Sequence, residues 1–205
     1  MRILLLLLSL VISYIVGSIP TAYIFGKLLK GIDIREHGSG NVGATNVFRV
    51  IGKVPGIIVL IIDFLKGFLA VTIIPLVLEL SYPGVFRGAI YFITLIGGAV
   101  IAGHIWTIFL KFKGGKGVAT TAGVMIALAP LVFLSCLIIW AVIFSVWRYV
   151  SLASIVASCA LPIMALVFGR SLSFIIFCCI LCAVGVYGHR SNIKRLIQGA
   201  EKKLI

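Results

Sequence analysis

Acidic side chains are scarce in this chain of 205 residues, which contains 5 Asp and Glu, 18 Lys and Arg, and 3 His. Sites for Mg²⁺ are built largely from carboxylate oxygens, so a magnesium-dependent nucleotide mechanism is disfavoured and no metal or cofactor is expected. The chain also has no G-x-S-x-G elbow and no Ser–His–acid arrangement, so nothing points to an acyl-enzyme intermediate.

Long polar stretches are missing as well. Hydrophobic residues make up 62% of the chain, whereas soluble domains contain roughly 45–50%. The composition therefore predicts an all-α polytopic membrane protein, with residues 1–205 forming a single domain and no room for a soluble module. The five cysteines lie in apolar runs without a second C-x-x-C pair, and we interpret them as small packing residues.

Basic residues give the chain a formal net charge of +13. No basic–aromatic module accompanies them, so no nucleic-acid partner is expected, and no obligate protein partner is evident. On a membrane protein such an excess marks cytoplasmic loops and favours anionic substrates or lipid headgroups. Segments 27–55, 111–117 and 190–203 carry five, three and five Lys and Arg, which predicts that all three lie on the cytoplasmic side.

The apolar runs between these segments predict the number of crossings. Because the lysine-rich loop and the C-terminal tail share one side, an even number of crossings must connect them, and Pro130 offers a turn. We predict about seven transmembrane helices, with the N-terminus outside and the C-terminus inside; a five-helix arrangement with re-entrant segments stays open. The expected crossings are residues 3–26 (kinked near Gly17 and Pro20), 56–78, 88–110, 118–129, 131–147, 151–168 and 172–187.

The stretch KFKGGKGVAT, residues 111–120, combines three lysines with three glycines. Glycines permit backbone conformations closed to other residues, so N–H groups can converge on an anion, and the lysines add point charges. This is not a Walker A loop, because Leu110 and Gly117 stand where that motif requires glycine and Ser or Thr. A basic loop whose glycines only form turns is the alternative. The candidate anion-binding residues are Lys113, Gly114, Gly115, Lys116 and Gly117.

A second candidate segment is GSGNVGATNVFR, residues 38–49. Its hydroxyl and amide groups on a glycine-rich backbone, followed by an arginine, suit phosphate oxygens. The alternative is an ordinary turn that leads into a helix cap, where the same residue types are common. The candidate ligands are Ser39, Gly40, Asn41, Gly43, Thr45, Asn46 and Arg49.

Three further features accompany these segments. Asp63 and Lys66 lie three residues apart on one face of an apolar helix, and we treat this intramembrane pair as support residues. His104 precedes the lysines by one to two helical turns, so it is either a core residue or a ligand. The turn around Ser151 and the tail segment 189–195 are expected on the same membrane face as the lysine loop.

Together these motifs resemble a known family, the bacterial integral-membrane glycerol-3-phosphate acyltransferases that use acyl phosphate as donor. SGNVGATN with Arg49 is similar to the family's first motif, GH followed by FLKFKGGKGVAT to the second, and HRSNIKRLIQG to the third. The stretches DFLKG (63–67) and RYVSLAS (148–154) also look like the family. One departure is Thr107, which stands where the second motif usually has proline.

The resemblance implies transfer of a fatty acyl group from acyl phosphate to the 1-hydroxyl of glycerol 3-phosphate. The products would be 1-acylglycerol 3-phosphate (lysophosphatidate) and phosphate, in phospholipid biosynthesis. It also implies a multi-pass protein of the bacterial cytoplasmic (inner) membrane with its site on the cytoplasmic face. A membrane transporter of phosphorylated metabolites is the alternative, but Arg148 and Arg170 are the only charged residues in 118–187, which argues against a polar path.

Residue roles follow from the needs of two phosphorylated substrates. The acyl phosphate would be held by Ser39, Thr45, Asn46 and the glycines of 38–43, with Ser151 and Lys116. Glycerol 3-phosphate would be held by Arg49, Lys113 or Lys116, His189 and Asn192. The proton of the attacking hydroxyl would go to His189 or to the departing phosphate, and the second route fits the shortage of general bases. The predicted catalytic residues are His189, Lys116, Asn192 and Ser151; further predicted substrate-binding residues are His104, Arg190 and Arg195.

Overall fold

The computed structural model describes residues 2–84 and 90–204, and the regular structure in those ranges is helical throughout, which confirms the all-α prediction. By length and composition, five helices of the described residues can cross a membrane, and a sixth crossing is counted if a helix pair bent by 57° is one span. The count of about seven crossings, the five-helix alternative and the orientation stay predictions.

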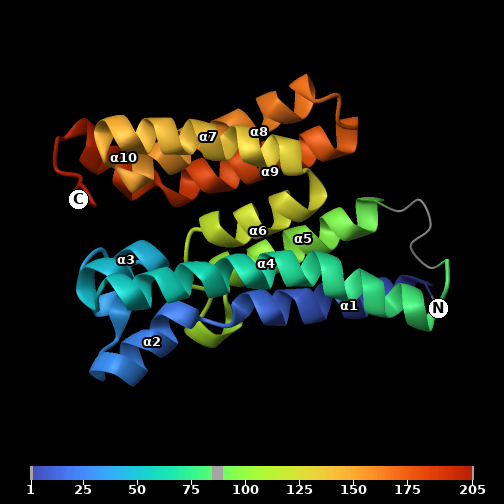
Figure 1. The fold of residues 1–205 in the computed structure, drawn as a ribbon. Helices are drawn as coiled ribbons and strands as arrows, with labels where there is room; N and C mark the ends of the chain where they lie inside the picture. The colour runs from blue at the N-terminus through green and yellow to red at the C-terminus, as the bar shows by residue number, and fades with distance from the viewer. Residues whose placement is uncertain (1, 85–89, 205) are drawn as a thin grey trace. The chain divides into compact units, whose positions relative to one another are not determined.

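The chain divides into two compact units, Met1–Leu128 and Ala129–Ile205. Their action as one domain over residues 1–205 stays a prediction. The first unit contains α1 (Arg2–Ser18), α2 (Thr21–Lys30), the 3₁₀ turn η1 (Ile34–Glu36), α3 (Ala44–Val50), α4 (Lys53–Ser81), α5 (Ile90–Ile105), the 3₁₀ turn η2 (Ile108–Leu110) and α6 (Val118–Leu128). The second contains α7 (Pro130–Trp147), α8 (Val150–Val167), α9 (Leu172–Gly188) and α10 (Arg190–Ile197) (Figure 1).

Prolines separate two pairs of helices where the sequence predicts breaks. Ile19 and Pro20 lie between α1 and α2, because the residue before a proline is pushed out of the helical conformation. Ala129 leaves the helical region with φ −152° and ψ 73°, and Pro130 then opens α7 at a position where a helix does not need its N–H group. The predicted start of the third crossing, at residue 88, lies outside the described residues.

Glycines allow two helix pairs of the first unit to approach until their backbones touch. α1 packs against α5 and α4 against α6. A Cβ added at Gly17 or Gly103 would lie 2.0 or 2.1 Å from a carbonyl oxygen of the facing helix, in α5 and α1 respectively. A Cβ added at Gly67 or Gly123 would lie 2.2 or 2.0 Å from a carbonyl oxygen in α6 or α4. Small residues at such crossings are typical of helices in membranes.

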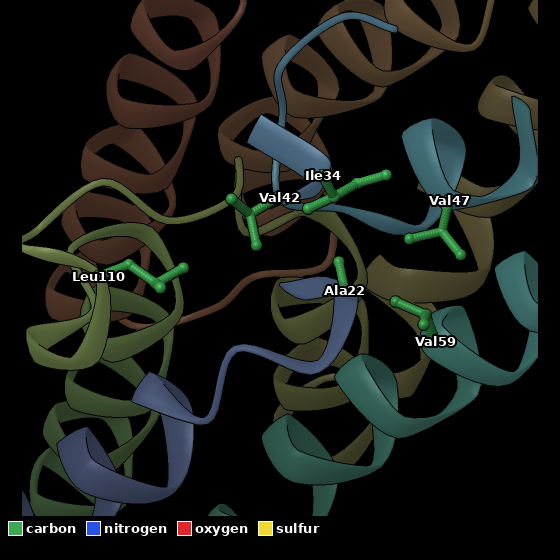
Figure 2. Packing of buried hydrophobic residues seen from close by; sticks show 6 residues of the cluster. All are labelled: Ala22, Ile34, Val42, Val47, Val59 and Leu110. Atoms are coloured by element: carbon green, nitrogen blue, oxygen red, sulfur yellow. The ribbon is translucent and has the colours of Figure 1, made fainter. Parts of the chain in front are cut away.

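A buried aliphatic cluster holds the polar segments of the first unit against its helices. The cluster joins α2, η1, α3 and α4 to the loop before α3 and to η2, and Figure 2 shows its side chains pointing toward one another. Burial of apolar surface stabilises this arrangement. Both candidate anion segments are therefore anchored at this cluster. Its members are Ala22, Ile34, Val42, Val47, Val59 and Leu110.

In the second unit, α8 contacts both α7 and α9, and α10 contacts α8 and α9. Trp140 of α7 donates a hydrogen bond from Nε1 to the hydroxyl oxygen of Ser154 in α8, at 3.1 Å. Arg148 ends α7 with φ 63°, in the left-handed region. Its carbonyl oxygen accepts a hydrogen bond of 3.1 Å from the N–H group of Leu204. This bond returns the tail beyond α10 to the turn that precedes α8.

The five cysteines are free. Cys136 and Cys178 are buried, as expected of packing residues, whereas Cys159 and Cys179 are exposed on apolar helices. Burial inside the protein therefore applies to only part of the set. An exposed thiol on an apolar helix behaves as a small hydrophobic group, which suits a surface that faces lipid.

We expect Gly123→Ala to lower the thermal midpoint of unfolding, because the new methyl group would lie 2.0 Å from the carbonyl oxygen of Phe64 and force α4 and α6 apart. Overpacking of this kind costs about 1–3 kcal/mol. Gly185→Ala is the matched control, since its methyl group would meet the rotatable side chain of Ser158 at 2.9 Å. Thermal unfolding of both variants in detergent measures the difference, and equal midpoints would contradict the close packing.

Candidate active site

The lysine loop 111–117 is docked onto the last turn of α5. The N–H group of Gly114 donates to the carbonyl oxygen of Ile105 at 3.0 Å. The N–H group of Gly115 donates to the carbonyl oxygen of His104 at 3.1 Å. The sequence led us to expect that these donors face an anion; instead, they attach the loop to the helix. Contact of the two glycines with a substrate stays a prediction.

Gly115 lies where no larger residue fits. A Cβ at this position would lie 2.2 Å from Nε2 of His104 and 2.6 Å from the carbonyl oxygen of Val42. Val42 belongs to the second candidate segment, 38–49. The backbones of the two candidate anion segments therefore meet at this glycine, within the first unit.

Asn46 organises segment 38–49 from inside. Its Oδ1 accepts a hydrogen bond from the N–H group of Ser39 at 2.9 Å. Its Nδ2 donates to the carbonyl oxygens of Ile34 and His37, at 3.2 and 3.0 Å. Gly38 has φ +63°, and a Cβ there would collide with the Asn46 amide. The side chain of Asn46 thus fixes the loop, and its contact with a substrate stays a prediction.

Asp33, close to the second candidate segment in the sequence, is paired with Arg35 through a hydrogen bond of 2.6 Å from the guanidinium to Oδ2. The hydrogen bonds from Arg35 lower the pKa of Asp33 to about 2, so this carboxylate is too weak a base to take a proton.

The other candidates of the first unit are more accessible than Asn46. Ser39 and Lys113 are exposed, whereas Gly40, Asn41, Gly43, Thr45, Arg49 and Lys116 are half-buried.

A buried group of polar side chains lies beneath the lysine loop. The predicted pair is confirmed: Lys66 Nζ lies 2.9 Å from Oδ1 of Asp63, and both side chains are buried. Oδ1 also accepts a hydrogen bond of 3.0 Å from the hydroxyl of Thr21. Nδ1 of His104 lies 3.7 Å from the same oxygen. Asp63 therefore ties α4 to α2 and faces α5.

Thr107 replaces the proline of the resembled motif without changing the backbone that proline requires. Its φ of −66° is the angle to which a proline ring fixes the chain. Its hydroxyl donates a short hydrogen bond to the carbonyl oxygen of Ser18. The threonine therefore links the start of η2 to the end of α1, a contact that proline does not make.

In the second unit, Ser151 and Asn192 converge on a carboxylate of the chain itself. Oε1 of Glu201 accepts hydrogen bonds from the Ser151 hydroxyl at 2.8 Å and from Nδ2 of Asn192 at 2.6 Å. Oε2 accepts a hydrogen bond from Nε of Arg195 at 2.7 Å. Burial raises the pKa of Glu201, but the hydrogen bonds from Asn192, Ser151 and Arg195 outweigh it and hold the pKa below its usual range.

His189 is buried at the junction of α9 and α10. Its Nδ1 lies 2.8 Å from the carbonyl oxygen of Gly185. A carbonyl oxygen only accepts, so Nδ1 carries the hydrogen and Nε2 carries the lone pair in the neutral ring. Arg190 is exposed, and its guanidinium carbon lies 4.3 Å from the centroid of the Tyr187 ring.

Sequence analysis did not single out Glu201, Thr21 or Val42. Glu201 is the only acidic residue in the basic tail, a signal that would have justified the search for its partners. Thr21 and Val42 carry no comparable signal, because their roles depend on which helices pack together. Among residues 2–84 and 90–204, no group of three or more His, Cys, Asp and Glu is placed to hold a metal ion.

Comparison with known proteins gives the family. The sequence pattern described as glycerol-3-phosphate acyltransferase matches residues 7–199. A glycerol-3-phosphate acyltransferase 2 of Moorella thermoacetica is 46% identical over 198 residues, which cover 97% of each chain. A glycerol-3-phosphate acyltransferase of Bacillus cytotoxicus is 44% identical over 96% of this chain and 93% of its own.

Solved structures share the fold. A crystal structure of PlsY, an integral membrane glycerol 3-phosphate acyltransferase, in its glycerol 3-phosphate form is 40% identical and has a TM-score of 0.86, covering 97% of this chain and 94% of its own. Its lysophosphatidic acid form has a TM-score of 0.83. These findings define a multi-pass integral membrane enzyme that transfers acyl groups. The chain belongs to the glycerol-3-phosphate acyltransferase family, which favours the enzyme over a transporter.

We expect Gly115→Ala to reduce acyltransferase activity, because its methyl group would overlap Nε2 of His104 and the carbonyl oxygen of Val42. The loop must then shift, and a misplacement on the order of 1 Å costs up to about a hundredfold in rate. Activity of the purified variant is the measurement, with Cys179→Ala, at an exposed position of α9, as the control. Activity equal to the wild type's would show that the loop's position is unimportant.

We expect Glu201→Gln to destabilise the protein at neutral pH more than in acid. The lowered pKa means that the carboxylate's contribution is present above the unfolded value of 4.5 and is lost as the pH falls through the folded value. The difference in thermal midpoint between wild type and variant should therefore shrink below about pH 4.5. Glu36→Gln, at an exposed carboxylate, is the control. A Glu201→Gln difference that is constant with pH would refute the assignment.

Proposed function

We propose that the protein transfers a fatty acyl group from acyl phosphate to the 1-hydroxyl of glycerol 3-phosphate, giving lysophosphatidate and phosphate. Family membership supports the acyl acceptor. The observation that carries a phosphorylated donor is the meeting of two basic, glycine-rich segments at Val42 and Gly115. Two such segments provide donors for two phosphate groups, one on each substrate.

The reaction needs no acyl-enzyme, because acyl phosphate is already activated. The hydroxyl oxygen of glycerol 3-phosphate bonds to the acyl carbonyl carbon, and the bond from that carbon to the phosphate oxygen breaks. Phosphate leaves with the electron pair, and the hydroxyl proton passes to an oxygen of the departing phosphate. The protein then has to hold the hydroxyl of glycerol 3-phosphate beside the acyl carbonyl carbon and stabilise the developing negative charge.

Residue roles in this proposal keep to the predicted motifs. In the first unit, Ser39, Thr45 and Lys116 hold the phosphoryl group of the donor, and Arg49 and Lys113 hold glycerol 3-phosphate. In the second unit, Ser151, His189 and Asn192 keep their predicted roles as substrate ligands. Nε2 of His189 is the alternative acceptor of the hydroxyl proton, since Nδ1 is committed to the Gly185 carbonyl. Lysine and arginine suit these roles because they stay charged at neutral pH.

We place the reaction at the cytoplasmic face of the bacterial inner membrane. The basic segments 27–55, 111–117 and 190–203 support this orientation through the preference of Lys and Arg for the cytoplasmic side. The soluble acceptor reaches the site from water, and the acyl chain of the donor remains in the bilayer. The lysine loop and segment 38–49 then lie where the two substrates meet.

The proposal is tested by measuring phosphate release from palmitoyl phosphate and glycerol 3-phosphate by purified protein in detergent or lipid cubic phase. We expect release only when both substrates are present, with one lysophosphatidate formed for each phosphate. Release without glycerol 3-phosphate would indicate a phosphatase. Lysophosphatidate formed from acyl coenzyme A but not from acyl phosphate would contradict the donor.

A further inference from the structure

Asp63 and Lys66 are charged side chains inside an apolar helix, only 2% and 7% exposed. Charges in such surroundings are costly unless they are paired, and each is fully engaged here. Besides the ion pair, Lys66 donates a hydrogen bond to the carbonyl oxygen of Ile19 at 3.3 Å. The ion pair with Lys66 explains how Asp63 stabilises the helix packing. The contact of Asp63 with His104, on its other side, points to a second role.

His104 stands between Asp63 and the lysine loop. On one side, Nδ1 of its ring lies 3.7 Å from Oδ1 of Asp63. On the other side, Nε2 lies so close to Gly115 that a Cβ there would be 2.2 Å away. The backbone carbonyl of His104 also accepts the N–H group of Gly115. The ring and the backbone of His104 therefore both hold Gly115 in place.

A small cavity lies in the same place, lined by Ser18, Thr21, Asp63, His104, Thr107 and Gly115, among others. Its volume of about 10 Å³ is close to the space that one water molecule needs. Ser18 is completely buried, and its hydroxyl oxygen has no hydrogen-bond partner among the described residues. The cavity is too small for a phosphate group, and the carboxylate of Asp63 would repel one.

We infer that Asp63 is a positioning residue for the lysine loop. Its carboxylate, together with one water molecule bound between Ser18, Asp63 and His104, fixes the ring of His104. The ring then fixes the position of Gly115. The positions of Lys113 and Lys116, which precede and follow this glycine in the loop, are fixed with it. This inference rests on the proposed function only in assigning glycerol 3-phosphate to Lys113 and the acyl donor to Lys116. It gives His104 a place under the loop, whereas the sequence led us to expect direct contact with the substrate.

Asp63→Asn tests the inference, because the amide keeps the shape of the carboxylate and removes its charge. We expect KM for glycerol 3-phosphate to rise by about tenfold or more, since a loop displaced by a fraction of an ångström holds its ligand poorly. KM for the acyl donor should rise as well, because Lys116, next to Gly115 in the same loop, is assigned to its phosphoryl group. Glu79→Gln removes one negative charge from the same helix, where Oε1 of Glu79 accepts the N–H group of Gly84, and should leave both values unchanged.

Hydrogen exchange of the backbone amides in residues 111–118, followed by mass spectrometry, gives a readout that does not depend on activity. We expect faster exchange in Asp63→Asn at Gly114 and Gly115, whose N–H groups are bonded to α5. Exchange in the second unit should stay unchanged. If the wild type shows no acyl transfer from acyl phosphate, the proposed function fails, and the exchange measurement still decides the inference.

Two results would overturn the inference. One is an Asp63→Asn variant with a lower thermal midpoint but normal exchange at the loop and normal KM, which would make the pair structural only. The other comes from His104→Gln, which also serves if Asp63→Asn does not fold. A raised KM with normal loop exchange in His104→Gln would mean that the ring contacts the substrate directly.

Discussion

Two backbone hydrogen bonds, from Gly114 and Gly115 to the last two carbonyl groups of α5, set the position of the lysine loop. A helix end leaves carbonyl groups without partners inside the helix. The loop satisfies them and is held by a rigid element in return. α5 is itself fixed against α1 at Gly103, one residue before His104. The geometry of the loop therefore depends on how closely two distant helices approach.

Negative charge in the described residues is largely committed to structure. Asp33, Asp63 and Glu201 each pair with a basic residue, at 2.6, 2.9 and 2.7 Å. The few carboxylates thus neutralise specific partners inside each unit and leave the basic loops with an excess of positive charge. In an enzyme of this family, an excess of positive charge in the loops suits acidic substrates.

The sequence predicted the helical fold, the breaks at Pro20 and Pro130 and the Asp63–Lys66 pair, because each depends on residues close together along the chain. Pro75 and Pro162 lie inside helices without ending them, so the presence of a proline does not by itself predict where a helix breaks. Contacts between residues far apart in the chain could not be predicted from the sequence. The meeting of Val42 with Gly115 depends on the packing of the buried cluster, and the bonds to Glu201 depend on the return of the tail toward Arg148. The predicted ligands themselves remain untested.

The contacts of Glu201 also have a consequence for biosynthesis. Ser151 is synthesised 50 residues before Glu201, so until Glu201 has been made the Ser151 hydroxyl and the amide of Asn192 lack this acceptor. Chains grow at about 5–20 residues per second, and elements synthesised first can pack first. The second unit can therefore form its helices early but gains the contacts of Glu201 only when that residue has left the ribosome. Until then, Ser151 and the basic helix α10 lack the Glu201 carboxylate that they contact in the folded protein.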